Sequence, residues 1–145
     1  MKRKWIPVLA ALIEALWRWT RSRRSASRPR RRVPGGNRDV GAAIARRAMD
    51  EQVQGAGRVV KLLPDDTIGS RHQRFLVRLA GGESLLVAHN LDVGRRVEPL
   101  REGDAVEFAG EYQWNDKGGF LHWTHHDPAG RHEPGWIRRR GVLFE

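Results

Sequence analysis

The stretch DAVEFAGEYQWNDKGGFLHWT, residues 104–124, decides the fold class. Its first half alternates, so that Val106, Phe108 and Tyr112 share one side of an extended chain and glutamates occupy the other. A period of two is typical of a half-buried β-strand. The run Asn-Asp-Lys-Gly at 115–118 is a strong turn signal, and the following GGFLHWT has the pattern of a returning strand. The stretch therefore predicts a β-hairpin.

Segments nearer the N-terminus alternate with the same period of two. Three further strands are predicted at VQGAGRVVKLL (53–63), HQRFLVRL (72–79) and ESLLVAHN (83–90), with turns at PDDTIGS and Gly-Gly between them. Residues 91–104 show no clear period. Five strands with a break between the third and fourth favour a small five-stranded OB-like Greek-key barrel, with an SH3-type sheet as the main alternative.

Outside the strands, the Ala-rich segment 39–52 predicts a short helix with Asp39 as its N-cap. We therefore expect a mainly β protein, with an OB-like β-barrel domain at 53–145 preceded by this helix. The chain has no cysteine, which excludes disulfides and thiolate metal sites.

The formal net charge of +10 is unevenly distributed. Residues 1–49 contain 14 Lys and Arg against two acidic residues, whereas residues 50–145 contain 13 against 15. A phosphate-binding domain usually carries its cations on the folded part. Nucleic acid is therefore not the favoured partner of the domain itself.

The N-terminal part divides into two segments. Residues 1–20 begin with three cations and continue as an apolar stretch between Trp5 and Trp19, which as a helix spans about 22 Å, short of the roughly 30 Å bilayer core. A signal peptide, a signal anchor and an amphipathic surface helix are the open interpretations. Residues 21–38 are Arg-rich and predict a disordered basic linker.

These two segments predict an anionic membrane surface as a partner and a location at the cytoplasmic membrane. We expect the domain on the extracytoplasmic side. The positive-inside tendency of the Arg-rich flank favours the cytoplasmic side, so both sides stay open.

Four of the six histidines lie in GGFLHWTHHDPAGRHEPGW, residues 118–136. On an extended strand His122 and His126 are about 13 Å apart, too far to share one ion. A metal site therefore needs partners from other strands, and His89, His122 and His126 are the candidate ligands for a divalent metal such as zinc. Such a site would suit a metal-dependent hydrolase or nuclease, so the sequence leaves open whether the protein is an enzyme.

The aromatic residues favour a different interpretation. OB-type barrels bind oligonucleotides and oligosaccharides on exposed faces. We expect Tyr112 and Trp123 to be core residues, and four residues near the strand ends to contact a ligand: Trp114, Trp136, His125 and Asp127. Glu107 and Glu111 are expected on a solvated face. The hypothesis is a binding module of unknown ligand, with the His-rich end of the barrel as its functional surface.

Several stretches resemble a known family. LPDDTIGSRHQRFLVRL, LLVAHNLD, LREGDAVEFAGEYQWNDKGG and LHWTHHDPAGRHEPGW, together spanning about 53–144, are similar to the bacterial DUF3465 family of unknown function, and HWTHHDP is the most specific motif. The resemblance implies a compact OB-like β-barrel domain and an export signal. It implies no activity and no catalytic residue.

Overall fold

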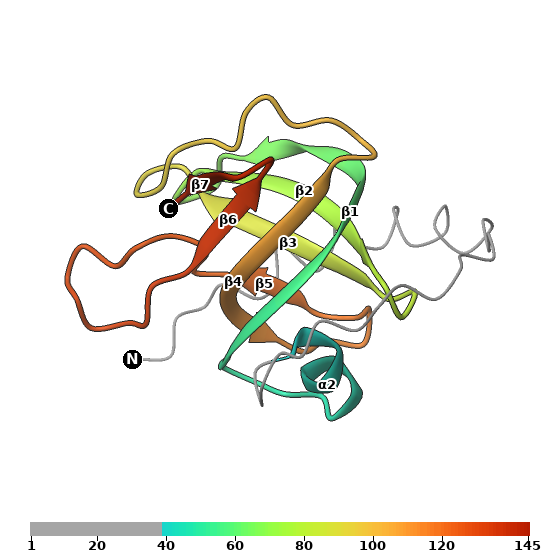
Figure 1. Ribbon diagram of the computed structural model, residues 1–145. Helices are drawn as coiled ribbons and strands as arrows, with labels where there is room; N and C mark the ends of the chain where they lie inside the picture. Colours follow the sequence, from blue (N-terminus) through green and yellow to red (C-terminus); the bar gives the residue numbers. More distant parts are fainter. Residues whose placement is uncertain (1–38) are drawn as a thin grey trace. The chain divides into compact units, whose positions relative to one another are not determined.

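The computed structural model describes residues 39–145, which form a mainly β domain (Figure 1). Within this part of the chain there are seven strands and one short helix. The elements are α2 (Val40–Ala45), β1 (Glu51–Asp66), β2 (His72–Leu79), β3 (Ser84–Asn90), β4 (Ala105–Gln113), β5 (Phe120–His122), β6 (Trp136–Arg139) and β7 (Val142–Phe144).

Five of these strands pair in a ring. β1 pairs with β2, β2 with β3, β3 with β5 and β5 with β4, and β4 returns to β1. Every pairing in the ring is antiparallel except that of β3 with β5. β5 is only three residues long and pairs with residues 111–113 at the end of β4. β6 pairs with residues 107–109 on the same edge of β4.

β1 belongs to both halves of the ring because it is long. Residues 51–58 pair with β4 and residues 57–66 pair with β2. Gly57 lies at the changeover and is paired with both Leu79 and Val106. A Cβ at Gly57 would lie 2.4 Å from Cγ1 of Val77, so the close approach of the two strands requires glycine here.

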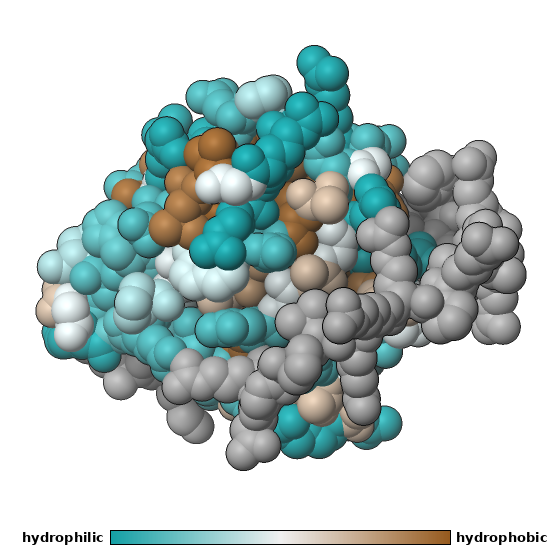
Figure 2. Space-filling model, in the orientation of Figure 1, coloured by the Kyte–Doolittle hydropathy of each residue, from teal (hydrophilic) through white to brown (hydrophobic). Residues whose placement is uncertain are grey.

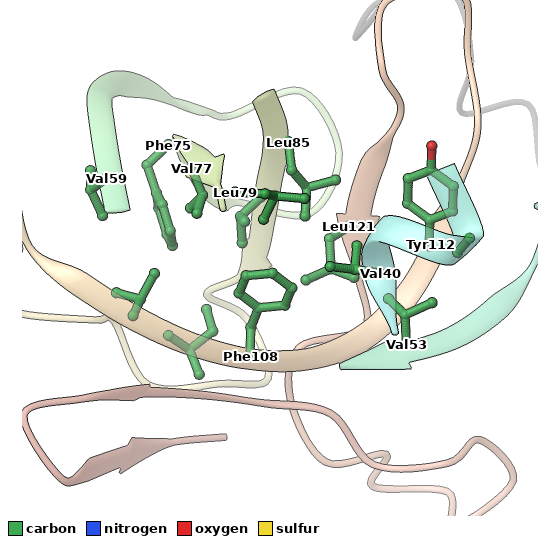
Figure 3. Close-up of a cluster of buried hydrophobic side chains, with 14 of the residues drawn as sticks. Val40, Val53, Val59, Phe75, Val77, Leu79, Leu85, Phe108, Tyr112 and Leu121 are labelled. Carbon is green, nitrogen blue, oxygen red and sulfur yellow. The ribbon is translucent and has the colours of Figure 1, made fainter. Parts of the chain in front are cut away.

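The core occupies the inside of the ring. In β4 the predicted alternation is confirmed, since Val106, Phe108 and Tyr112 are buried. The same holds in β2 for Phe75, Val77 and Leu79 (Figure 3). Inward apolar side chains from all seven strands form one continuous hydrophobic core.

The helix α2 packs on this core at the start of β1. The Oδ1 atom of Asp39 accepts a hydrogen bond from the backbone N–H of Ala42 at 2.9 Å, so Asp39 is the N-cap that the sequence indicates. The helix buries Val40 and Ala43 and ends at Ala45. It is shorter than the expected 39–52 because the chain reverses and enters β1 at residue 51.

The described part of the chain has seven strands rather than the predicted five, because β6 and β7 form a hairpin near the C-terminus. Its two-residue turn places Arg140 and Gly141 at φ 48° and 77°, which suits a tight hairpin. The three consecutive arginines at 138–140 do not show the period of two from which the other strands were predicted. Arg139 is buried in an ion pair, with its Nε 2.6 Å from Oδ2 of Asp104.

The predicted N-terminal segment (1–20) and basic linker (21–38) lie outside the described residues. No helix within 39–145 has the length and apolar character needed to span a membrane.

Candidate ligand-binding face

A glutamate on β4 is held between two histidines. Oε1 of Glu111 lies 3.0 Å from Nε2 of His122, and Oε2 lies 2.6 Å from Nε2 of His132. His122 is the cross-strand partner of Glu111 on β5, whereas His132 reaches it from the loop between β5 and β6. The Glu111 carboxylate therefore links the loop between β5 and β6 to the sheet.

The hydrogen bonds from the two histidines lower the pKa of Glu111 to about 2, with that from His122 as the largest cause, against the opposing effect of burial. Glu111 is therefore a carboxylate throughout the neutral range. The other ring nitrogen of His132, Nδ1, lies 2.7 Å from the carbonyl oxygen of Glu133. The two ring nitrogens of His132 therefore each face an oxygen atom, which fixes the orientation of the ring.

The His132 ring stacks on an indole. Its centroid lies 4.2 Å from that of Trp123, and the two planes are 8° apart. Trp123 adopts φ 52°, which ends β5 after His122 and turns the chain away from the sheet. The expectation that Trp123 is a core residue is therefore only partly met: the ring is partly exposed and packs between His132 and His125.

Asp127 organises the loop that carries His132. Its Oδ1 accepts from the backbone N–H of Ala129 at 2.9 Å, and its Oδ2 accepts from Arg131 and His132, each at 2.8 Å. These three bonds lower the pKa of Asp127, the bond from Ala129 first. These bonds lie within the loop, so Asp127 holds His132 in position.

The remaining predicted histidines have separate surroundings. His89 is buried, with Nδ1 2.8 Å from Oγ1 of Thr124 and Nε2 2.8 Å from the carbonyl oxygen of Arg95. Burial lowers the pKa of His89 to about 4. His125 is also buried and its Nδ1 donates to the carbonyl oxygen of His126, whereas His126 itself is exposed.

Within residues 39–145, no three or more His, Asp or Glu side chains are arranged to hold a metal ion. His89, His122 and His126 therefore do not form such a group in this structure. Both nitrogens of His89 have protein partners, and the one bonded nitrogen of His122 is directed at Glu111.

The two tryptophans predicted to contact a ligand lie in different places. Trp114 packs against the core and has the Arg47 guanidinium 5.0 Å from its ring centroid. Trp136 lies on β6 opposite Ala109, partly exposed, with Arg138 4.9 Å from its ring. Only Trp136 shares a surface with Glu111.

That surface is the outward side of the β1–β4 ribbon, here called the β1–β4 face. Cross-strand pairing sets Gln52 beside Glu111, Gln54 beside Ala109 and Ala56 beside Glu107. β5, the following loop and β6 add four side chains along the other edge of β4: His122, His132, Trp136 and Arg138. β1, β4 and β6 lie toward the viewer in Figure 1, and in the same orientation Figure 2 shows hydrophilic, intermediate and hydrophobic colours side by side over this region.

The β1–β4 face contains an unsatisfied polar atom. Nε2 of Gln52 donates to the carbonyl oxygen of Pro134 at 3.3 Å. Its Oε1 is buried and has no hydrogen-bond partner among the described residues. A buried acceptor without a donor is costly, so this atom is a local weak point in the packing of the β1–β4 face.

Sequence reasoning placed Glu111 on a solvated face and did not select Gln52 or His132 as site residues. The period of two puts Glu111 on the correct, outward side. The feature that indicates a site is the strand register, which pairs Glu111 with Gln52 on β1 and with His122 on β5. That register joins segments about 60 and 11 residues apart and cannot be read from any one of them.

The DUF3465 family, described as proteins of unknown function, matches residues 35–145. This chain belongs to the DUF3465 family. The match extends over α2 and all seven strands, and it confirms the resemblance carried by HWTHHDP. No curated protein matches the chain. The DUF3465 assignment therefore leaves the function to be argued from the β1–β4 face.

Proposed function

We propose that this DUF3465 domain is a binding module and that the β1–β4 face contacts its ligand. The observation that carries the proposal is a partly exposed indole, Trp136, on the same side of the sheet as Glu111, whose carboxylate is held between His122 and His132. Ligand sites combine apolar contact with a few polar groups held in place, and this face has both.

The ring of pairings supports an OB-like barrel as the scaffold of this module. β4 closes on β1 after the order β1, β2, β3, β5, β4, which gives five strands and a partly open wall where β5 is short. OB-folds are five-stranded, partly open Greek-key barrels that present a sheet face and loops to oligomeric ligands. The β6–β7 hairpin is then an addition to the five-stranded plan.

Binding has more support than acid–base catalysis. A general base works best with a pKa near the working pH. The pKa of Glu111 is lowered to about 2 and that of His89 to about 4, both well below neutrality. These groups are suited to holding structure and orienting contacts, and a proton taken from a substrate at neutral pH would not stay on either.

A metal-dependent hydrolase or nuclease is the alternative function, and elemental analysis of the purified full chain tests it. Less than about 0.1 equivalent of bound metal, with no uptake on zinc titration, removes it. Stoichiometric metal that is lost on His122→Gln, with the fold intact, keeps the metal-dependent alternative open to an activity assay.

The proposed setting is the bacterial cytoplasmic membrane, reached by export or by tethering through residues 1–20. The apolar stretch and the basic residues that follow it support this. Membrane fractionation of the full chain and of a chain lacking residues 1–20 tests it. A full chain found entirely in the soluble cytoplasmic fraction overturns it.

Nuclear magnetic resonance of the full chain tests the binding module directly. Four probe classes are titrated in turn: neutral oligosaccharides, single-stranded oligonucleotides, unstructured peptides and zinc. We expect one class to shift the Gln52 side-chain amide and the Trp136 indole signals, while the amide of exposed Ile68 stays in place. Shifts confined to residues outside the β1–β4 face, or none with any class, contradict the proposal.

A further inference from the structure

Two arginines are directly opposed on the outward side of the sheet, where the pairing of β1 with β4 ends. Arg58 on β1 is the cross-strand partner of Arg78 on β2. Their chain neighbours Val59, Val77 and Leu79 are buried in the core, so both arginine side chains lie on the other side of the sheet. Opposed residues in an antiparallel pair have Cβ atoms about 4.5–5.5 Å apart, and like charges there are destabilising. An anion between the two guanidinium groups would remove this repulsion.

We propose that the Arg58–Arg78 pair is a binding site for a phosphate group. The site goes beyond the proposed binding function, because it does not require Trp136 or Glu111 to contact a ligand. No ion pair within residues 39–145 includes either arginine. Both carry a full positive charge at any physiological pH, since a guanidinium is not deprotonated in proteins.

Most N–H groups of Arg58 have no acceptor within the described residues. The side chain is exposed, and its Nη1 donates to the carbonyl oxygen of Gly103 at 3.0 Å. That bond uses one of the five N–H groups of the guanidinium, and its acceptor is neutral. The residue paired with Arg58 on β4 is Ala105, which is exposed and small. Ala105 therefore leaves room for an anion beside the guanidinium.

Arg78 supplies the second guanidinium. Its Nε is buried and has no hydrogen-bond partner among the described residues. The side chain as a whole is partly exposed, so a ligand would contact its Nη groups and not Nε. Ser84, also partly exposed, is the partner of Arg78 on β3 and places a hydroxyl on the same side of the sheet. A partly buried cation without a counter-charge is costly, and an anion at the Nη groups would offset that cost.

The number of donors favours phosphate over a carboxylate. A single guanidinium is enough for a carboxylate, which it binds through two parallel N–H···O bonds. A phosphate group has more oxygen atoms and carries up to two negative charges at neutral pH. It can therefore accept from two guanidinium groups and a hydroxyl at the same time, and the planar fork of arginine matches its geometry.

The surroundings favour a single phosphate group over a nucleic-acid strand. A strand bound through its backbone needs several unpaired cations along its path. Farther along β4 the outward charge is Glu107, which is paired with Arg138 at 3.0 Å. Residues 50–145 hold 13 Lys and Arg against 15 acidic residues, so the positive charge is local to the pair. The phosphate then comes from a small phosphorylated molecule or from a phospholipid headgroup.

Nuclear magnetic resonance of the full chain measures binding through the side-chain Nε–Hε signals of Arg58 and Arg78. Three probes are titrated at constant ionic strength: inorganic phosphate, dihexanoylphosphatidylglycerol below its micelle concentration, and acetate. We expect a phosphate probe to shift both signals and acetate to leave them in place. A stronger response to inorganic phosphate supports a small phosphorylated ligand, and a stronger response to the lipid supports a headgroup. No response to either phosphate probe, or an equal response to acetate, overturns the proposal.

Variants of Arg58 separate a phosphate site from diffuse positive charge. Arg58→Gln acts at an exposed position and relieves the repulsion, so the fold stays intact, and we expect phosphate binding about tenfold weaker. Arg58→Lys keeps the charge but loses the paired N–H groups, and we expect it to weaken binding as well. Arg131→Gln, which removes an exposed charge from the loop between β5 and β6, should leave binding unchanged. Wild-type affinity in Arg58→Lys, or equal effects of Arg58→Gln and Arg131→Gln, would overturn the proposal.

Failure of this inference is distinguishable from failure of the binding module. If another probe class shifts the Trp136 indole signal while phosphate leaves both arginine signals in place, the binding module stands and the phosphate site is rejected. If phosphate shifts the arginine signals and no probe shifts that of Trp136, the phosphate site stands on its own.

Discussion

Oγ1 of Thr124 lies 2.8 Å from Nδ1 of His89, and both residues are fully buried. Nε2 of the same ring faces the carbonyl oxygen of Arg95, an acceptor, so it carries the proton and Nδ1 accepts from the threonine hydroxyl. The neutral imidazole thereby joins β3, the chain after it and the segment that follows β5. His89 is a structural residue of the barrel end.

This role makes the stability of the domain depend on pH. Burial lowers the pKa of His89 to about 4 from its usual 6.5, so the folded protein resists its protonation. The stabilising effect is complete above pH 6.5 and is lost as the pH falls from 6.5 to 4, at a cost of about 3 kcal/mol. Burial also lowers the pKa of His72 and of His125, which adds a loss of the same sign. Urea unfolding between pH 7.5 and 4.5 measures the slope.

His89→Gln should flatten that slope, because glutamine does not titrate, although the variant is less stable at neutral pH. His126→Gln is the matched control, since His126 is exposed. An unchanged slope in His89→Gln would assign the pH dependence to other groups.

Thr124→Val tests the hydroxyl alone. Valine has nearly the same shape, but it leaves Nδ1 of His89 without a donor in a fully buried site. We expect a loss of about 1–3 kcal/mol in the free energy of unfolding. Thr67→Val, at an exposed position, should change it by less than about 0.5 kcal/mol. Equal effects of the two variants would show that the hydrogen bond contributes nothing.

Glu111→Gln should release the loop that carries His132. The amide cannot accept two charge-assisted hydrogen bonds as the carboxylate does, so we expect a loss of about 1–3 kcal/mol at neutral pH. The pKa of Glu111 is depressed to about 2, so its contribution is present above the usual carboxyl range and is lost as the pH falls through 2. Hydrogen exchange should accelerate within residues 123–135.

Glu102→Gln, an exposed substitution outside the strands, is the control for Glu111→Gln and should leave exchange in that loop unchanged. Protection of residues 123–135 that survives in Glu111→Gln would mean that Asp127 alone holds the loop.

The sequence predicted the strands in which buried and exposed residues alternate. It did not predict the features that depend on contacts between residues far apart in the chain. Val106, Phe108 and Tyr112 are core residues because their spacing alone puts them on one side. Arg139 could not be recognised as buried, since the charge is offset by Asp104, 35 residues away.

The site was harder to predict than the strands for the same reason. The sequence indicated a site from the histidines in and near HWTHHDP. The role of each histidine depends on its hydrogen-bond partner, which is Thr124 for His89 and Glu111 for His122 and His132. Spacing along one strand excluded a contiguous metal site but could not show which oxygen each ring faces.

Gly135→Ala should be among the most damaging single substitutions in the chain. A Cβ at this position would lie 1.9 Å from the carbonyl oxygen of Trp123 and 2.6 Å from that of Ala109. Both obstacles are backbone atoms, and the N–H of Gly135 is itself bonded to the carbonyl oxygen of His125 at 2.9 Å, so the chain cannot move aside locally. We expect a loss of more than about 3 kcal/mol and a changed near-ultraviolet circular dichroism signal from Trp123.

Gly130→Ala separates this clash from ordinary backbone strain. Gly130 has φ 64° and open space around the added methyl group, so the substitution should cost only about 1–2 kcal/mol. Thermal unfolding of both variants makes the comparison. If Gly135→Ala were no more destabilising than Gly130→Ala, the approach of the three backbone segments at Gly135 would have to be looser than the structure shows, and the loop would not fix His132 against Glu111.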